Sequence, residues 1–240
     1  MIIAFVPGYI TYGSVARNSY RGPLNLIVPV MFFLGAVFVL LVSTLSLETA
    51  LDVRRIYTLE HENITDALTG TFNRRYLDRR LDEEVLRARR YGFPLAVLLL
   101  DIDHFKEIND EHGHPFGDGI LAGLSQIVMN SVRKTDVVAR YGGDEILVIA
   151  THTPLLDAAE LGERLRQRVE GAVMGQANKA GGGVPVRVTI SVGVAGYNDE
   201  LSSGQALIQA ADQALYQAKQ AGRNRTVTAQ GILEQQKPAS

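Results

Sequence analysis

Residues 137–149 read VVARYGGDEILVI, two apolar runs separated by a pair of glycines and a pair of acids. Apolar, valine- and isoleucine-rich runs on either side of a tight turn predict a β-hairpin. Gly142 and Gly143 can both adopt positive φ, which a two-residue type I′ turn requires, so we expect them to form the turn. Asp144 and Glu145 would then lie near the tip of a rigid hairpin, where carboxylate oxygens can bind Mg²⁺. Taken alone, the pattern fits a solvated hairpin equally well.

A second pair of acids follows a strand. Residues 95–100, LAVLLL, form the continuous apolar run that is typical of a strand buried on both faces. The run leads into Asp101-Ile102-Asp103, so we expect Asp101 at the end of a central strand, facing a site. Asp103 either shares that site or is a surface residue.

Further motifs occur in a fixed order along the chain. With the hairpin they are DALTG at 66–70, NRR at 73–75, DID at 101–103 and AKQAGRNR at 218–225. In these motifs the chain resembles the GGDEF family of diguanylate cyclases, which condense two GTP into cyclic di-GMP. The resemblance implies an α/β domain over residues 66–228, with a central mixed five-stranded sheet flanked by helices and related to the palm of nucleotide cyclases and polymerases.

The resemblance also assigns a metal site. It implies that the carboxylates of Asp101 and Asp144 and the backbone carbonyl of Ile102 hold Mg²⁺, with Mn²⁺ as a second candidate. Asp101, Asp144 and Glu145 are the implied catalytic residues. Forming a 3′,5′ phosphodiester requires a polarised α-phosphate and a deprotonated 3′ hydroxyl. Glu145 either completes the metal site or assists that deprotonation.

Substrate contacts are implied in the same way. The expected GTP-binding residues are Lys106, Lys219 and Arg223 for the triphosphate, Asn109 and Asp118 for guanine, and Gly142 and Gly143 at the turn. Lys219 and Arg223 would lie one helical turn apart, at i and i+4. Asn109 and Asp118 are otherwise ordinary turn or cap residues, and the three cations are otherwise solvated charges.

A site for the product is implied before the hairpin. Arg133 and Asp136 match the family's inhibitory Arg-x-x-Asp, and Arg164 matches a secondary arginine of that cyclic di-GMP site. Alternatively, Arg133 and Asp136 belong to an ordinary solvated loop, and Arg164 is an exposed helix residue.

The chain begins with apolar sequence. Residues 24–47 contain no charge and as a helix would span about 36 Å, enough to cross a bilayer. We therefore predict a transmembrane helix there. Residues 1–23 form a second apolar segment, either a partial span, a re-entrant piece or the remnant of a longer membrane domain. Residues 48–65 are expected to be a helical linker, and residues 229–240 a disordered polar tail.

Composition limits the remaining classes of function. The net charge is −2, which argues against general nucleic-acid binding, and cysteine is absent, which excludes disulfides and thiolate sites. The leading hypothesis is a homodimeric diguanylate cyclase anchored in the bacterial inner (cytoplasmic) membrane, with its catalytic domain in the cytoplasm, where GTP is found. Ile146 stands where the family signature has Phe. The alternative is therefore a weakly active or inactive module that binds GTP or cyclic di-GMP.

Overall fold

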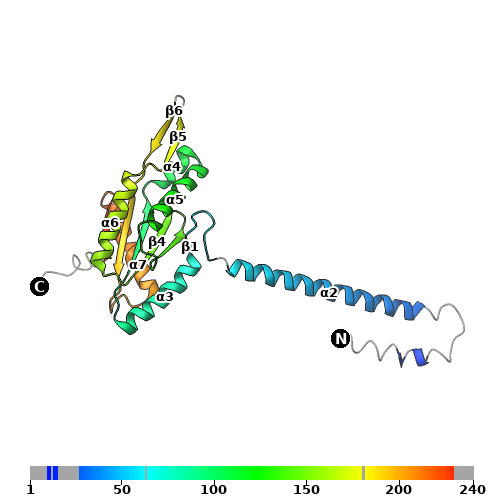
Figure 1. Ribbon diagram of the computed structural model, residues 1–240. Helices are drawn as coiled ribbons and strands as arrows, with labels where there is room; N and C mark the ends of the chain where they lie inside the picture. The colour runs from blue at the N-terminus through cyan, green and yellow to red at the C-terminus, as the bar shows by residue number, and fades with distance from the viewer. Residues whose placement is uncertain (1–9, 12, 16–26, 63, 180–181, 230–240) are drawn as a thin grey trace. The chain divides into compact units, whose positions relative to one another are not determined.

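Two compact units make up the chain, Met1–Asn63 and Ile64–Ser240. The computed structural model describes residues 10, 11, 13–15, 27–62, 64–179 and 182–229, and its elements are labelled in Figure 1. Most of the apolar segment predicted at residues 1–23 and residues 230–240 of the predicted tail lie outside the described residues. The tail prediction began one residue too early, because Ala229 is 5% exposed and packs in the core.

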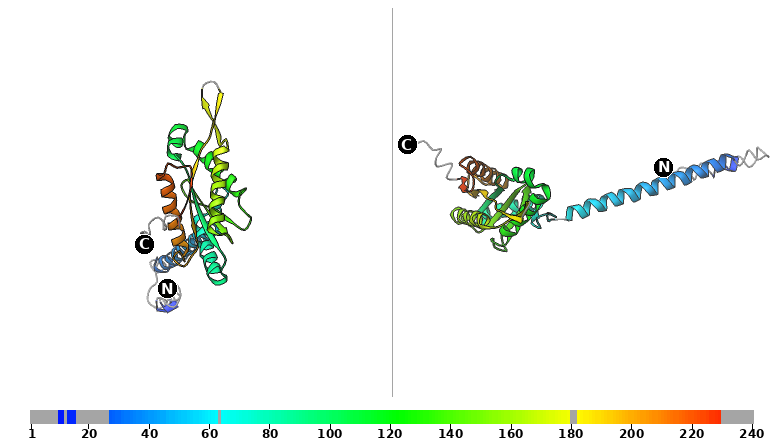
Figure 2. Two further views of the ribbon diagram at one scale, coloured as in Figure 1. Left: turned by 90° about the vertical axis from the view of Figure 1, so that its left-hand side faces the viewer. Right: turned by 90° about the horizontal axis from the view of Figure 1, so that it is seen from above.

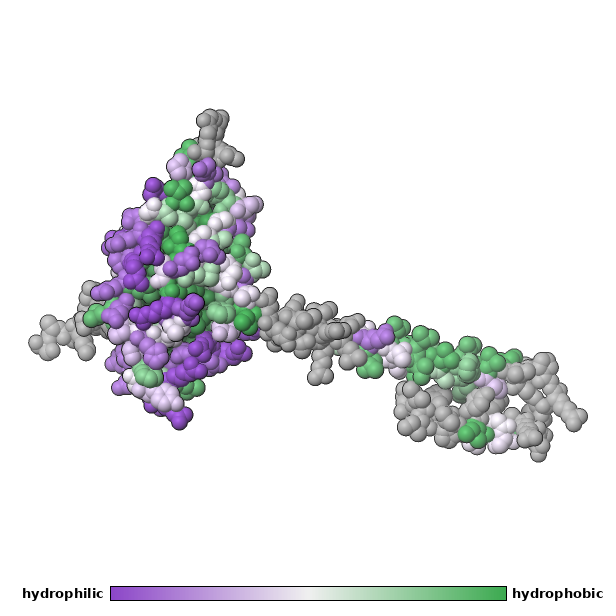
Figure 3. Space-filling view, in the orientation of Figure 1, coloured by the Kyte–Doolittle hydropathy of each residue, from purple (hydrophilic) through white to green (hydrophobic). Residues whose placement is uncertain are grey.

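The first unit is dominated by one long helix, α2 (Ile27–Glu62). Residues 27–47 of the expected span and 48–62 of the expected linker therefore lie in one helix, whereas Ile64 and Thr65 of the expected linker belong to the second unit. This continuity is understandable, because no proline or glycine interrupts residues 36–62. Within α2, Pro29–Ala50 is long and apolar enough to cross a membrane, and none of it is buried. Figure 3 shows these apolar side chains along the helix.

The C-terminal unit is an α/β domain. Its helices are α3 (Arg74–Tyr91), α4 (Phe105–His112), α5 (His114–Met129), α6 (Leu155–Gly171) and α7 (Gly204–Gln220). Its strands are β1 (Phe72–Asn73), β2 (Leu95–Ile102), β3 (Val137–Gly142), β4 (Glu145–Thr151), β5 (Gly175–Lys179), β6 (Gly182–Val186), β7 (Ile190–Gly196) and β8 (Thr226–Thr228).

The sheet is mixed, as predicted, but it has six strands in the order β1-β3-β4-β2-β7-β8 rather than five. The two edge strands, β1 and β8, contain only 2 and 3 residues and pair in parallel with β3 and β7. Such short strands leave no alternating pattern in a sequence. The β5–β6 hairpin forms a separate two-stranded sheet.

Helices cover both faces of the sheet (Figures 1 and 2). On one face, α5 and α6 pack against β2 and β7 through a core that includes Leu124 and Leu165. On the other face, α3 and α7 enclose a second core that includes Leu81 and Leu215. Every residue of β2 is buried, so this strand is central, as its uninterrupted apolar run predicted. Its last residues are thereby held on the most rigid part of the domain.

Candidate active site

Two acids lie side by side where β2 ends and β4 begins. Asp101, 6% exposed, is the cross-strand partner of Glu145 on β4 and of Ser191 on β7. Burial raises the pKa of Asp101, and the negative charge of Asp144 adds to this, whereas Lys219 lowers it. Burial and the charge of Asp101 likewise raise the pKa of Glu145. The structure thus brings together the three acids that the sequence singled out.

The hairpin turn differs from the prediction. Gly142 is the last residue of β3 and pairs with Glu145, so the loop consists of Gly143 and Asp144. Only Gly143 has positive φ, at 46°. The expected type I′ turn on both glycines is therefore wrong, because a bulge between Arg140 and Gly142 shifts the register by one residue. The shift places Asp144 itself in the turn.

The acid cluster has the chemistry of a divalent-cation site. Hard oxygen ligands suit Mg²⁺, and a bound cation would relieve the mutual repulsion that helps raise the pKa values of Asp101 and Glu145. Ile102 is 1% exposed and buries an aliphatic side chain, so only its backbone carbonyl can be a ligand. Among the described residues, however, no three acidic or histidine side chains converge closely enough to enclose a metal. Asp101 is paired with a protein cation instead.

That cation is Lys219, in the last turn of α7. Its Nζ lies 2.8 Å from Asp101 Oδ2. Arg223 does not sit one helical turn further along, as we expected, because α7 ends at Gln220. Arg223 is exposed, lies in the loop beyond the helix and has φ of 60°. Gly222, φ 107°, ends the helical path and redirects the chain.

The residues expected to bind guanine lie on two adjoining helices. Asn109 is on α4 and Asp118 is exposed on α5. Asn109 Oδ1 is buried and has no hydrogen-bond partner. A Cβ atom at Gly117 would collide with this oxygen, so any larger residue there would force the Asn109 side chain to move. Lys106 is exposed in the first turn of α4, which begins just after the acid cluster.

The expected product site is a turn before β3. Asp136 Oδ2 accepts a hydrogen bond of 2.9 Å from the Arg133 backbone, and its Oδ1 accepts one of 3.3 Å from the backbone of Thr151. Arg133 is exposed, as is Arg164 on α6, and no bond joins Arg164 to the other two within the part of the chain described. The turn that contains Arg133 and Asp136 is therefore formed, but no hydrogen bond or ion pair joins Arg164 to it among the described residues.

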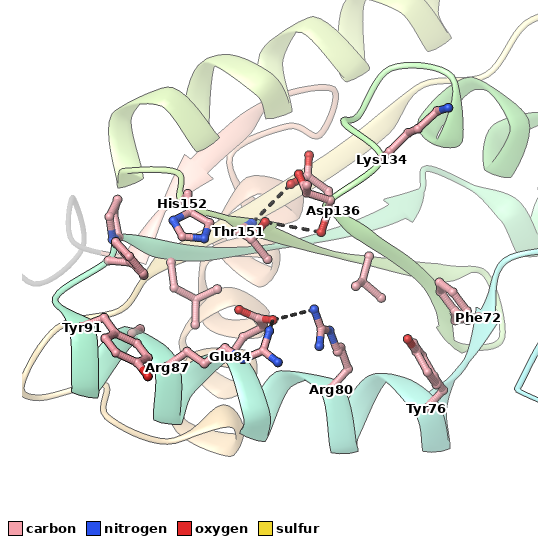
Figure 4. A pocket seen from close by; sticks show the side chains of 16 residues that line it. Phe72, Tyr76, Arg80, Glu84, Arg87, Tyr91, Lys134, Asp136, Thr151 and His152 are labelled. Carbon is pink, nitrogen blue, oxygen red and sulfur yellow. Dashed lines mark hydrogen bonds and ion pairs between the residues drawn. The ribbon is translucent and has the colours of Figure 1, made fainter.

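Asp136 borders a cavity of about 410 Å³ between α3 and the starts of β2 and β3 (Figure 4). Arg80 and Arg87 flank the buried Glu84 on its helical wall, with N–O distances of 2.7 and 2.9 Å. Tyr91 and His152 lie toward one end and Tyr76 toward the other. No role was predicted for the α3 residues of this cavity, because the charges of α3 fit a solvated face.

Two further residues support the signature turn. Arg140 donates hydrogen bonds of 3.0 and 2.8 Å to the carbonyl oxygen of Gly143 and one of 3.3 Å to Asp66. Asp66 in turn accepts from the backbone and hydroxyl of Thr69. Although burial opposes it, these bonds and the charge of Arg140 hold the pKa of Asp66 below its ordinary value. In the sequence, the only indication of a role for Asp66 and Arg140 was that they belong to the DALTG motif and the hairpin stretch.

Asp103 is not a surface residue. It is 4% exposed, and its carboxylate accepts hydrogen bonds from Thr189, Ser191 and the backbone of Asn224. The surface alternative assumed that strand alternation points Asp103 away from Asp101, whereas side chains two residues apart on a strand share a face, and both carboxylates are buried.

Sequence comparison identifies relatives of the C-terminal unit. Residues 63–225 match the family described as diguanylate cyclase, GGDEF domain. The response regulator PleD of Caulobacter vibrioides is 43% identical over 164 residues, covering 68% of this chain and 36% of PleD. Diguanylate cyclase DosC of Escherichia coli is 43% identical over 165 residues, covering 69% of this chain and 35% of DosC. The chain thus spans about a third of the length of these relatives.

Solved structures show the same fold. The GGDEF domain of DgcB from Caulobacter crescentus, in complex with c-di-GMP, superposes with a TM-score of 0.64 at 31% identity, covering 69% of this chain and 93% of that one. Diguanylate cyclase SiaD of Pseudomonas aeruginosa, in complex with its activator SiaC, gives a TM-score of 0.63 at 31% identity over 94% of this chain and 82% of SiaD. Because the family match covers residues 63–225 and the fold is shared with solved GGDEF domains, the chain belongs to the GGDEF family of diguanylate cyclases.

Proposed function

We propose that the C-terminal unit condenses two molecules of GTP into cyclic di-GMP and releases two molecules of pyrophosphate. One observation carries the proposal: Asp101, Asp144 and Glu145 lie together, and Lys219 pairs with Asp101. The helix that follows β2, α4, carries the buried acceptor Asn109 Oδ1, which has no hydrogen-bond partner. Acids that hold a cation, a protein cation for phosphate and a polar base pocket are the three requirements of nucleotidyl transfer.

The residues proposed to bind the base lie on α4 and α5. A buried acceptor without a donor is unfavourable, and the N1–H and N2–H groups of guanine would supply the missing donor to Asn109 Oδ1. Asp118 offers a second acceptor on the adjoining helix. Adenine presents an acceptor at N1 and no amino group at C2, so it would leave Asn109 unsatisfied. This favours GTP over ATP.

In the reaction, the 3′ hydroxyl of each GTP attacks the α-phosphorus of the other, a new P–O bond forms, and the bond to pyrophosphate breaks. Glu145 accepts the hydroxyl proton, because a carboxylate with a raised pKa is a stronger base than an ordinary one. Lys219, Arg223 and Lys106 balance the charge of the triphosphate. Since each unit binds one GTP, the working enzyme is a homodimer.

The acid cluster would hold Mg²⁺, or Mn²⁺, through the carboxylates of Asp101 and Asp144 and the carbonyl of Ile102. When bound, the cation polarises the α-phosphate. Lys219, which pairs with Asp101, would be free to contact substrate phosphate where a bound cation neutralised that carboxylate.

Three features concern the whole chain. Pro29–Ala50 of α2 anchors the protein in the inner membrane of a bacterium, with the C-terminal unit in the cytoplasm, where GTP is available. The linker part of α2 holds two copies together. Cyclic di-GMP binds at Arg133, Asp136 and Arg164 and inhibits its own synthesis; the turn that joins the Arg133 backbone to Asp136 supports this assignment.

The test is to incubate the full chain in detergent with GTP and Mg²⁺ and to identify the nucleotides by mass spectrometry. We expect cyclic di-GMP and pyrophosphate in a ratio of one to two, and ATP should give no cyclic product. Asp144→Asn is the matched control for contaminating enzymes. Tight binding of GTP without turnover would instead support the alternative of a signalling module that only binds the nucleotide.

A further inference from the structure

The loop that carries Arg223 has an uncommon backbone. Gly222, Arg223 and Asn224 have φ values of 107°, 60° and 47°, three left-handed residues in succession. Glycine adopts this region readily and asparagine tolerates it, but for arginine it is unfavourable. Such a conformation persists only where surrounding contacts fix it.

A buried carboxylate supplies the first of these contacts. Asp103 Oδ2 accepts the backbone N–H of Asn224 at 3.1 Å and the hydroxyl of Thr189 at 2.7 Å, and Oδ1 accepts the hydroxyl of Ser191 at 2.7 Å. The backbone N–H of Asp103 donates to the Thr189 carbonyl at 2.9 Å. Asp103 thus ties the loop to β2 and to the start of β7.

The side chain of Asn224 is held from the opposite direction by α6. Its Oδ1 accepts a hydrogen bond of 2.7 Å from Arg166, and its Nδ2 donates one of 2.8 Å to Glu170. Arg166 is itself fixed, since its guanidinium contacts Glu163 at 2.7 Å and Glu170 at 2.8 Å. An Asn at this position therefore has both its backbone and its amide group engaged.

We propose that Asp103 and Asn224 are positioning residues that hold Arg223 in its left-handed conformation and so direct its guanidinium to the phosphates of the substrate. The backbone conformation at Arg223 fixes the direction of its Cα–Cβ bond, and Arg223 is also anchored by its own N–H, which donates to the Ala218 carbonyl at 3.0 Å. Neither proposed residue needs to touch substrate. The inference rests on the proposed function, which assigns Arg223 to the triphosphate.

The experiment measures binding of 3′-deoxy-GTP, which cannot be cyclised, to the full chain, with guanosine as the comparator that lacks phosphate. Arg223→Ala should weaken 3′-deoxy-GTP binding about tenfold or more and leave guanosine binding unchanged. Asn224→Gly retains access to positive φ but removes the contacts with α6. It should weaken 3′-deoxy-GTP binding about tenfold, again without affecting guanosine.

The double variant distinguishes positioning from a separate effect. If Asn224 acts through Arg223, then adding Asn224→Gly to Arg223→Ala should change affinity by less than about twofold. Asp103→Asn, measured if its melting curve shows a folded protein, should behave like Asn224→Gly. Ser125→Ala, which removes a buried hydrogen bond to Leu121 on α5, is the control for lost stability alone.

The outcomes separate the two proposals. If Arg223→Ala weakens triphosphate binding but Asn224→Gly does not, the positioning role is wrong and the proposed function stands. Additive losses in the double variant, or an equal loss of guanosine binding in Asn224→Gly, also overturn positioning. If Arg223→Ala has no effect on 3′-deoxy-GTP, both the positioning role and the assignment of Arg223 to the triphosphate are overturned.

Discussion

Lys219 Nζ lies 2.8 Å from Asp101 Oδ2, so the last turn of α7 is joined by an ion pair to the end of the central strand β2. The Asp101 side chain is 9% exposed and the Lys219 side chain is 33% exposed. A buried carboxylate beside two other acids requires a positive partner, and Lys219 provides it. Metal and substrate binding are therefore expected to be coupled through this lysine.

Replacing either carboxylate of the proposed metal site should abolish synthesis. Asp101→Asn and Asp144→Asn are nearly isosteric, and each should lower the initial rate of cyclic di-GMP formation at least about a hundredfold, the scale of losing one preorganised electrostatic contact. Melting curves should show that both variants are folded. Turnover at the wild-type rate with saturating Mg²⁺ would remove that residue from the metal site.

Glu145 should make metal-free protein less stable at neutral pH. Its pKa is raised by burial and by Asp101, so the folded state holds the proton more tightly than the unfolded state. Stability therefore falls as pH rises from the ordinary glutamate pKa through the raised one, and the loss is complete above it. Glu145→Gln should raise Tm at neutral pH in EDTA, and the gain should vanish below about pH 4.

Glu163 provides the opposite control in the same titration. The hydrogen bond from Arg166 holds the pKa of Glu163 below its ordinary value, so its stabilisation is present above the unfolded pKa and lost as pH falls. Glu163→Gln should thus lower Tm at neutral pH. If Glu145→Gln lowers Tm as Glu163→Gln does, the pKa of Glu145 is not raised as the structure indicates.

Arg140 should be needed for the shape of the signature turn. Its planar guanidinium binds the Gly143 carbonyl and Asp66 together, which the single ammonium group of lysine cannot reproduce. We expect Arg140→Lys to lower stability by about 1–2 kcal/mol and the initial rate by about tenfold. The matched control is Arg89→Lys, an exposed residue of α3. An unchanged rate in a destabilised variant would limit Arg140 to a structural role.

The assignment of the product site predicts a specific change in progress curves. Arg133→Ala should raise the plateau of cyclic di-GMP while leaving the initial rate within about twofold of wild type, because inhibition and catalysis use different residues. Added cyclic di-GMP should inhibit wild type but not the variant. Equal inhibition of the two proteins would return Arg133 and Asp136 to a solvated loop.

Sequence patterns predicted the parts of the fold that depend on local order. The LAVLLL run identified β2 as a central strand, and Ile146 is fully buried, as expected of a core position in the signature. The motifs also predicted that Asp101, Asp144 and Glu145 lie in one cluster, because the end of a strand and the tip of a hairpin can both be located from local sequence. Three features were missed. A bulge moved the turn and the backbone after Gly222 took Arg223 off its helix, because neither irregularity has a pattern in the sequence. The partners of Asp103 come from segments that are distant in the sequence.

Activity should depend on two copies of the chain. Each C-terminal unit is proposed to bind one GTP, so a single unit cannot form both phosphodiester bonds. The linker part of α2 would keep two units at a high effective concentration.

Removing residues 1–57 leaves the whole unit from Ile64, including the Ile64 carbonyl that accepts the N–H of Asn73. Activity per molecule of this fragment should rise in proportion to its concentration while it is mainly monomeric. Fusing a parallel dimeric coiled coil before residue 58 should restore activity at low concentration. Constant specific activity across a dilution series, in a fragment shown by light scattering to be monomeric, would contradict the two-site mechanism.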